Sequence, residues 1–207
     1  MSHRKEMSCE LLMEKYIAHP YWQEREEVIR IQRDSGMNRQ KSDEKRMAAL
    51  KAQLNKVGSS LEQYRELEKR AERQWYRTDS KDDGAIVIPR HQLAGCLVEA
   101  VGRAPRNLRG RFDKDSFRHL VQMSDFVTDK TASDGVFDRY VKLEKSNMRS
   151  RQRNEYVESF TAKGTVSIPS DVKVEDVRRL LEYAIEDIGV GASRKMGFGR
   201  GVVVSLD

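Results

Sequence analysis

Five of the thirteen glycines in this 207-residue chain lie in one short segment near its end, GVGASRKMGFGRG, residues 189–201. Each glycine costs conformational entropy on folding, so such a cluster indicates that the backbone needs unusual dihedral angles or close approach to another group. Residues 174–188 before it carry apolar side chains at helical spacing, and residues 201–206 after it are apolar and β-branched. We therefore expect a helix, a glycine-rich loop and a terminal strand, in that order.

This order excludes two familiar phosphate-binding loops. A dinucleotide-binding loop places GxGxxG between a strand and the following helix, and Arg194 stands here where the third glycine would fall. The pattern GxxxxGK followed by Ser or Thr, typical of nucleoside triphosphatases, is absent. The loop can still bind phosphate, because exposed amides donate to anions and Arg194, Lys195 and Arg200 supply positive charge. The alternative is a tight helix-to-strand connection in which the glycines relieve crowding.

The rest of the chain is basic and carries two arginine clusters. The formal net charge is +6 and 35% of the residues are charged, which favours an anionic partner such as nucleic acid. We expect residues 102–120 to form a cationic loop. Arginines at every second position of 149–153 would share one face of an extended chain, where they either bind an anion or protect a solvated strand edge. The candidate phosphate contacts in these clusters are Arg106, Arg109, Arg111, Arg149, Arg151 and Arg153.

Residues 21–76 are polar and helical in pattern, and we expect a helical hairpin inserted into the fold. Ser42 is suited to begin one helix, Gly58 to end it, and Ser60 with Gln63 forms a capping box that opens a second. The dense charge on the remaining faces fits either a solvated structural hairpin or an arm that touches nucleic acid.

Short strands are expected on both sides of this insertion. They lie at 11–17, at 85–88 where Pro89 closes the strand, within 117–127, at 136–148, at 156–168 with Gly164 as an irregularity, and at 201–206. Between them, the helix containing Leu93 and Leu97 carries Gly95, which we expect to let a neighbour approach closely. The fold class is therefore α+β: an antiparallel sheet with helices on one face, formed by residues 1–20 and 77–207 and interrupted by 21–76.

Several chemistries have no support in the sequence. Cys9, Cys96 and four scattered histidines show no metal-ligand spacing, and no GxSxG nucleophile motif occurs, so we expect no metal and no cofactor. No apolar run approaches the roughly 20 residues that span a bilayer. The expectation is a soluble, cytoplasmic protein in a reducing setting.

Two segments resemble a known family. GVGASRKMGFGRGVVVSL is similar to the C-terminal glycine-rich signature of the RAMP superfamily, the CRISPR-associated RNA-binding proteins, at Gly191, Ala192, Arg194 and 197–199. IVIPRHQLAGCLVEAV is similar to the strand and first helix of the backbone subunits of CRISPR effector complexes, with Arg90, His91 and Gln92 in place of the usual small polar residues. The matching residues of the second segment are Ile88, Pro89, Leu93 and Gly95.

The resemblance implies a ferredoxin-like fold and a non-catalytic subunit that coats single-stranded guide RNA in an antiviral ribonucleoprotein, beside other subunits or copies of itself. The loop residues implied to contact RNA are Gly191, Ser193, Arg194, Lys195, Gly197, Gly199 and Arg200. Two alternatives stay open. Some members of this superfamily are metal-independent endoribonucleases, for which His19, His91 and His119 are candidate acids or bases. An interaction module from a mobile element, which joins or blocks a defence complex, is the other.

Overall fold

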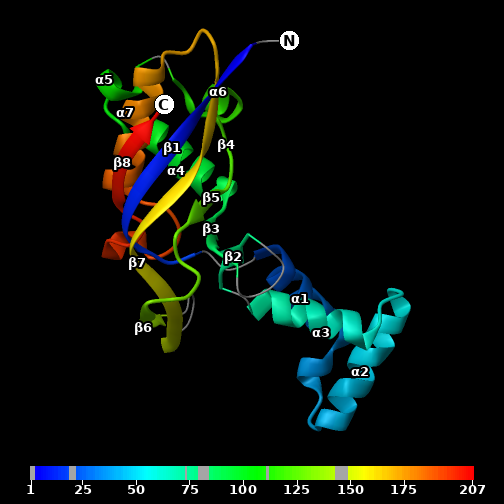
Figure 1. Cartoon of the computed structure of the whole chain (residues 1–207). Helices are drawn as coiled ribbons and strands as arrows, with labels where there is room; N and C mark the ends of the chain where they lie inside the picture. Colours follow the sequence, from blue (N-terminus) through cyan, green and yellow to red (C-terminus); the bar gives the residue numbers. More distant parts are fainter. Residues whose placement is uncertain (1–2, 19–21, 73, 79–83, 111, 143–148) are drawn as a thin grey trace. The chain divides into compact units, whose positions relative to one another are not determined.

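The chain folds into two compact units, shown in the computed structural model of Figure 1. One unit consists of Met1–Ala18 and Trp75–Asp207, and the other of His19–Gln74. The structure describes residues 3–18, 22–72, 74–78, 84–110, 112–142 and 149–207.

The larger unit is built on an open antiparallel sheet, as the sequence predicts. Strand β1 (Arg4–Tyr16) lies between the long strand β7 (Arg149–Pro169) and the terminal strand β8 (Gly201–Leu206). β7 also pairs with strands β4, β5 and β6, and β5 continues the sheet through β3 and β2. These shorter strands are β2 (Tyr76–Arg77), β3 (Ile86–Ile88), β4 (Gln122–Met123), β5 (Phe126–Thr128) and β6 (Gly135–Lys142).

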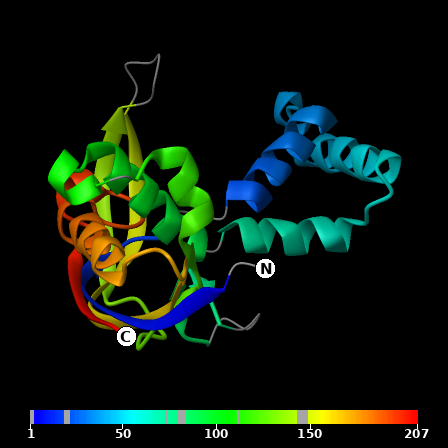
Figure 2. The same cartoon turned by 90° about the horizontal axis from the view of Figure 1, so that it is seen from above.

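Helices cover one side of this sheet (Figure 2). Successive side chains of β1 point to opposite faces of the sheet. Cys9, Leu11 and Met13 face the helices and are at most 2% exposed. Leu12 faces the other side and is 46% exposed. Each such buried side chain contributes roughly 1.5–3 kcal/mol relative to its exposed state. The helices are α4 (Arg90–Arg103), α5 (Arg106–Arg109), α6 (Lys114–Leu120) and α7 (Val174–Tyr183), which continues into the π-helical turn η2 (Ala184–Ile188).

The structure corrects several expected elements of this unit. The segment expected to be a cationic loop contains α5 and α6, and its Phe112 and Phe117 are buried in an edge-to-face contact with ring centroids 5.1 Å apart. Gly164 does not interrupt β7; a Cβ there would collide with the ring of Phe126. The irregularity lies instead at Ser159, whose φ is 51°. The first strand begins at Arg4, earlier than the predicted 11–17.

The smaller unit holds three α-helices and the short 3-10 helix η1 (Met37–Arg39) among its described residues, where the sequence predicts two helices. The α-helices are α1 (Trp22–Ser35), α2 (Asp43–Lys56) and α3 (Leu61–Glu72). The predicted caps are present: Ser42 Oγ accepts from the amide of Lys45, and Ser60 and Gln63 bond each other's amides reciprocally at 3.1 and 2.8 Å. Helix α1 was missed because its apolar residues are few among many charges.

Candidate nucleic-acid interface

The loop between η2 and β8 is shaped by its glycines. Gly189, Gly191, Gly197 and Gly199 have φ between 81° and 86°, a region that side chains other than glycine rarely adopt. A Cβ on Gly199 would collide with the backbone of Val190, and one on Gly191 with the carbonyl of Ile17. Gly197 is different, since a Cβ there would meet no atom within 4 Å. Three of the four are therefore required by close packing inside the protein.

The backbone of this loop bonds to itself and to β1. The amide of Val190 donates to the carbonyl of Gly199 at 2.8 Å, and the amide of Gly199 donates to the carbonyl of Lys15 at 2.5 Å. The amide of Ala192 donates to the carbonyl of Ile17 at 2.8 Å. These three amides are used within the protein, so the loop is held firmly in one position and any phosphate contact falls to its other groups.

Helix α4 holds the loop from the other side. The Cys96 thiol donates to the carbonyls of Ala184 and Gly189 at 3.2 and 3.1 Å, and burial raises the pKa of this thiol to about 12. One turn further along the helix, Glu99 accepts from Arg194 at 2.5 Å and also pairs with Arg103 at 2.7 Å. Arg194 thus ties the loop to α4. Beside it, the Ser193 hydroxyl is buried without a hydrogen-bond partner among the described residues.

The outward side of the loop is basic. Lys195 and Arg200 are exposed, as is Gly197 between them. Arg139 of β6 reaches the same loop, where its Nη1 donates to Met196 Sδ at 3.6 Å. We call Arg139, Lys195 and Arg200 the basic loop surface.

Aromatic side chains join β6 to the loop beneath this surface. Phe198 is buried, and its ring centroid lies 5.0 Å from that of Phe137 on β6 and 6.2 Å from that of Tyr156 on β7. The sequence analysis missed Phe137 and Arg139. Their alternate spacing on one strand places them on one face, which is the signal that could have found them.

Arg153, the last of the three predicted arginines at the start of β7, lies on the other face of the β6–β7 hairpin. Asn154 pairs with Phe137, whose ring faces the loop, so the odd-numbered positions of β7 belong to the opposite face. Arg153 is exposed there, opposite Asp138, and Trp75 donates to neighbouring Glu155 at 2.8 Å. Arg149 and Arg151 occupy the same alternate backbone positions, opposite Lys142 and Tyr140. The register therefore separates Arg153 from the basic loop surface.

The third predicted cluster is also separate. Arg106 is exposed and Arg109 half-buried on α5, which lies beside α7 near the C-terminus, whereas the loop precedes β8 at the strand's other end (Figure 1). Arg111 lies outside the described residues.

The residues proposed for catalysis are dispersed. His91 is exposed on α4 with its ring edge-on to Tyr76 at 5.6 Å, and His119 is exposed on α6. His19 lies outside the described residues. Within the part of the chain that the structure describes, no group of three or more His, Cys, Asp or Glu side chains could hold a metal ion, and no helix is long and apolar enough to cross a bilayer.

The fold is similar, at a low level, to solved structures that include the following two. No protein-family model matches, and no curated protein matches in sequence. A chain of the type III-B Cmr-beta complex bound to cognate target RNA matches with a TM-score of 0.47 and 11% identity over 99% of this chain, which spans 60% of the length of that chain. Cmr6 from Pyrococcus furiosus matches with a TM-score of 0.35 and 10% identity, over 98% of this chain and 100% of that one. At this degree of likeness, neither assigns an activity here.

Proposed function

We propose that this chain is a non-catalytic subunit that binds single-stranded RNA in a CRISPR-type ribonucleoprotein. The resemblance of residues 86–101 and 189–206 to RAMP proteins supports the class, and the net charge of +6 supports an anionic partner. The basic loop surface is the proposed contact with the sugar-phosphate chain, and Arg153 and Arg106 are secondary candidates on other faces.

The strand order supports a ferredoxin-like core for this function. Four neighbouring strands of the sheet, in the order β8, β1, β7 and β5, pair antiparallel. Along the chain, helix α4 lies between β1 and β5, and helix α7 lies between β7 and β8. This is the order of a split βαβ arrangement, in which two crossover helices cover one face. Residues 21–76 are then an insertion after the first strand.

One observation carries the proposal. The loop is fixed by hydrogen bonds of its amides and by the Arg194–Glu99 pair, yet Lys195 and Arg200 remain exposed, and Arg139 contacts Met196 of the same loop. Cations on a rigid support bind phosphates with little further loss of conformational entropy. Because phosphates carry no base identity, the expected binding is independent of sequence and sensitive to salt.

The test is a binding titration of the full chain with fluorescein-labelled single-stranded RNA at two salt concentrations. The Lys195→Glu, Arg200→Glu double variant should weaken binding by about tenfold or more. The control is Lys5→Glu, Lys173→Glu, which makes the same change of net charge at exposed lysines away from the loop. Equal losses in both variants would mean that net charge alone attracts RNA, and would overturn the proposed contact.

The same titration distinguishes the enzymatic alternative. After incubation in chelator, the RNA is run on a denaturing gel. Discrete fragments that disappear with His91→Ala would favour a metal-independent endoribonuclease, whereas intact RNA supports a binding subunit.

A further inference from the structure

Gly95 occupies the interior of α4 although the packing of the described fold does not require a glycine there. Its φ lies outside the left-handed region, and a Cβ at this position would meet no atom within 4 Å. Gly102 of the same helix differs, because a Cβ there would collide with the side chain of Lys114. A glycine inside a helix costs about 1 kcal/mol relative to alanine. The glycine therefore keeps open a space beside α4 that no other described atom fills.

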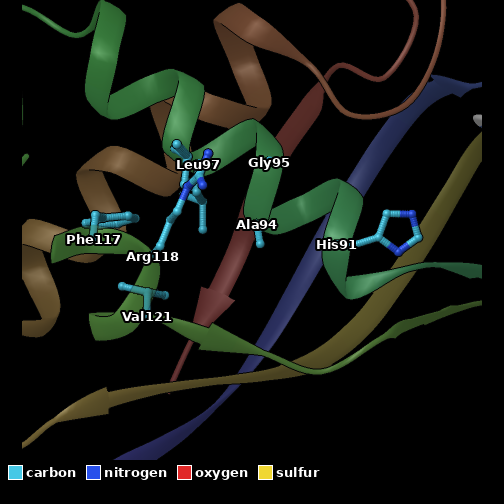
Figure 3. Close-up of a pocket in the computed structure, with 8 residues that line it drawn as sticks. His91, Ala94, Gly95, Leu97, Phe117, Arg118 and Val121 are labelled. Atoms are coloured by element: carbon cyan, nitrogen blue, oxygen red, sulfur yellow. The ribbon is translucent and has the colours of Figure 1, made fainter. Parts of the chain in front are cut away.

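That space is a cavity of about 340 Å³ between α4 and α6. Ala94, Gly95 and Val98 line it from α4, and Phe117 and Val121 line it from α6 and the residue that follows (Figure 3). Its walls are thus mainly apolar, and Gly95 is part of the wall on the side of α4. An apolar cavity of this size is at the lower end of the range for sites that bind a ligand or an anchoring side chain.

The cavity has a basic edge. Arg118 extends from α6 toward Leu97 on α4, and His91 marks the other end (Figure 3). Among the described residues no carboxylate pairs with Arg118, and the nearby Glu99 is already shared by Arg103 and Arg194. The charges on the two helices are Arg90, Arg103, Lys114 and Arg118 against Glu99 and Asp115. An occupant with acidic groups beside an apolar one is favoured electrostatically.

We propose that this cavity is a docking site for an acidic peptide segment of a partner protein, with one leucine- or phenylalanine-sized side chain inserted against Gly95. A side chain of this kind buries apolar surface without leaving polar atoms unpaired. A nucleobase would bury polar edges against the side chains of Ala94, Val98 and Val121, which form no hydrogen bonds, and Arg118 and His91 lie only at the ends of the cavity. Burying unpaired polar groups is costly.

This site is separable from the basic loop surface. On α4, residues 91, 94, 95 and 98 form one helical stripe that lines the cavity, whereas Cys96 and Glu99 lie on the neighbouring stripe and bond to the loop. The inference therefore goes beyond the proposed RNA binding, and either can fail without the other.

The test uses two short fluorescent peptides, each with a central phenylalanine or leucine flanked by glutamate and aspartate, titrated with the full chain. Gly95→Leu fills the cavity and replaces a poor helix former by a good one, so it should leave the melting temperature unchanged or raised. It should weaken peptide binding by about tenfold or more. The matched control is Ala52→Leu, which adds a leucine at an exposed helical position of α2 and should not change the affinity.

A second variant and a second measurement complete the design. Arg118→Glu should weaken the acidic peptides and favour the same peptides with lysine flanks. Methyl resonances of Leu97, Val98 and Val121 should shift when peptide is added to the unaltered chain. This measurement does not depend on the folding of any variant.

Failure of both peptides to bind, or peptide binding unaffected by Gly95→Leu, would overturn the proposal. Loss of RNA affinity in Gly95→Leu with no peptide binding would reassign the cavity to nucleic acid.

Discussion

Arg194 of the glycine-rich loop donates from Nη1 to Glu99 Oε2 of α4 at 2.5 Å, across 95 positions of sequence. The pair is partly buried, with the two side chains 34% and 26% exposed. This cation therefore serves to anchor the loop, and its charge is already balanced by a carboxylate. Lys195, the next residue, is exposed on the outer side of the loop.

Arg194→Ala should consequently affect stability more than RNA binding. Glu99 keeps Arg103 as a partner after the change, so no buried charge is orphaned and the expected loss is only about 1 kcal/mol in the free energy of unfolding. RNA affinity should change by no more than about twofold, because the exposed cations supply the contacts that release counterions. Chemical denaturation and the RNA titration measure the two quantities. A larger loss of RNA affinity than in Lys195→Ala would show that Arg194 leaves Glu99 to bind RNA.

Two glycines of the loop form a matched pair for mutation. Gly197 and Gly199 both have positive φ, but only at Gly199 would a Cβ collide with backbone, that of Val190. Gly197→Ala should cost about 1–2 kcal/mol from the dihedral strain alone. Gly199→Ala should cost about 3 kcal/mol or more, since strain and collision add. Equal changes in the melting temperature of the two variants would contradict the close packing of Gly199 on Val190.

The cysteines should be unreactive in the folded protein. Both are free and buried, and burial raises the pKa of Cys9 and of Cys96 to about 12 from an ordinary 9.0. Iodoacetamide at neutral pH should therefore label neither thiol until the protein is unfolded in guanidinium, because the thiolate is the nucleophile. Mass spectrometry before and after unfolding measures this. Rapid labelling of the native protein at either residue would mean that the loop or the sheet opens.

The raised pKa values of the two thiols also make the free energy of unfolding depend on pH. Between pH 9 and about 12 they ionise in the unfolded chain and stay protonated in the folded one, so stability present below pH 9 is lost as the pH rises. The loss approaches about 1.4 kcal/mol per pH unit for each thiol. Cys9→Ala should make the decline in the free energy of unfolding shallower by about that amount, measured by denaturation at successive pH values. An unchanged slope would show that Cys9 is solvated.

The salt dependence of the RNA affinity should show how many cations of the protein contact phosphates. If Arg139, Lys195 and Arg200 each meet one phosphate, the logarithm of the affinity should fall with the logarithm of salt concentration with a slope of about −2. Arg139→Gln should reduce the magnitude of that slope by about 0.7. A slope that is the same in this variant would remove Arg139 from the interface.

The sequence predicted the elements whose signals are local. The apolar periodicity of 174–188 became α7 and η2 with Val177, Leu181 and Ile185 buried, and the caps at Ser42 and Ser60 formed as the residue types require. The glycine-rich loop was also placed correctly between a helix and β8. Each of these depends on interactions within a few residues.

The arrangement of the candidate site depends on distant pairings and was not predictable in this way. Which face carries Arg153 follows from the register of β6 on β7, set by pairs such as Gly135 with Tyr156. The partner of Arg194 lies on a helix that no pattern in the loop identifies. Even the glycines could not be sorted by sequence: Gly197 faces open space, whereas Gly199 and Gly191 face backbone.

The long strand β7 is held on both sides of Ser159, whose φ is 51°. Strand β1 pairs with Val157 and Glu158 before this residue and with Phe160 and the residues beyond it, whereas Arg149 to Tyr156 pair with β6. The paired part of β6 and β7 is therefore continuous with the main sheet, and β1 holds it at the residues next to Tyr156. The position of Arg139 on this hairpin is therefore fixed through β1 as well as through the contact of Arg139 with Met196.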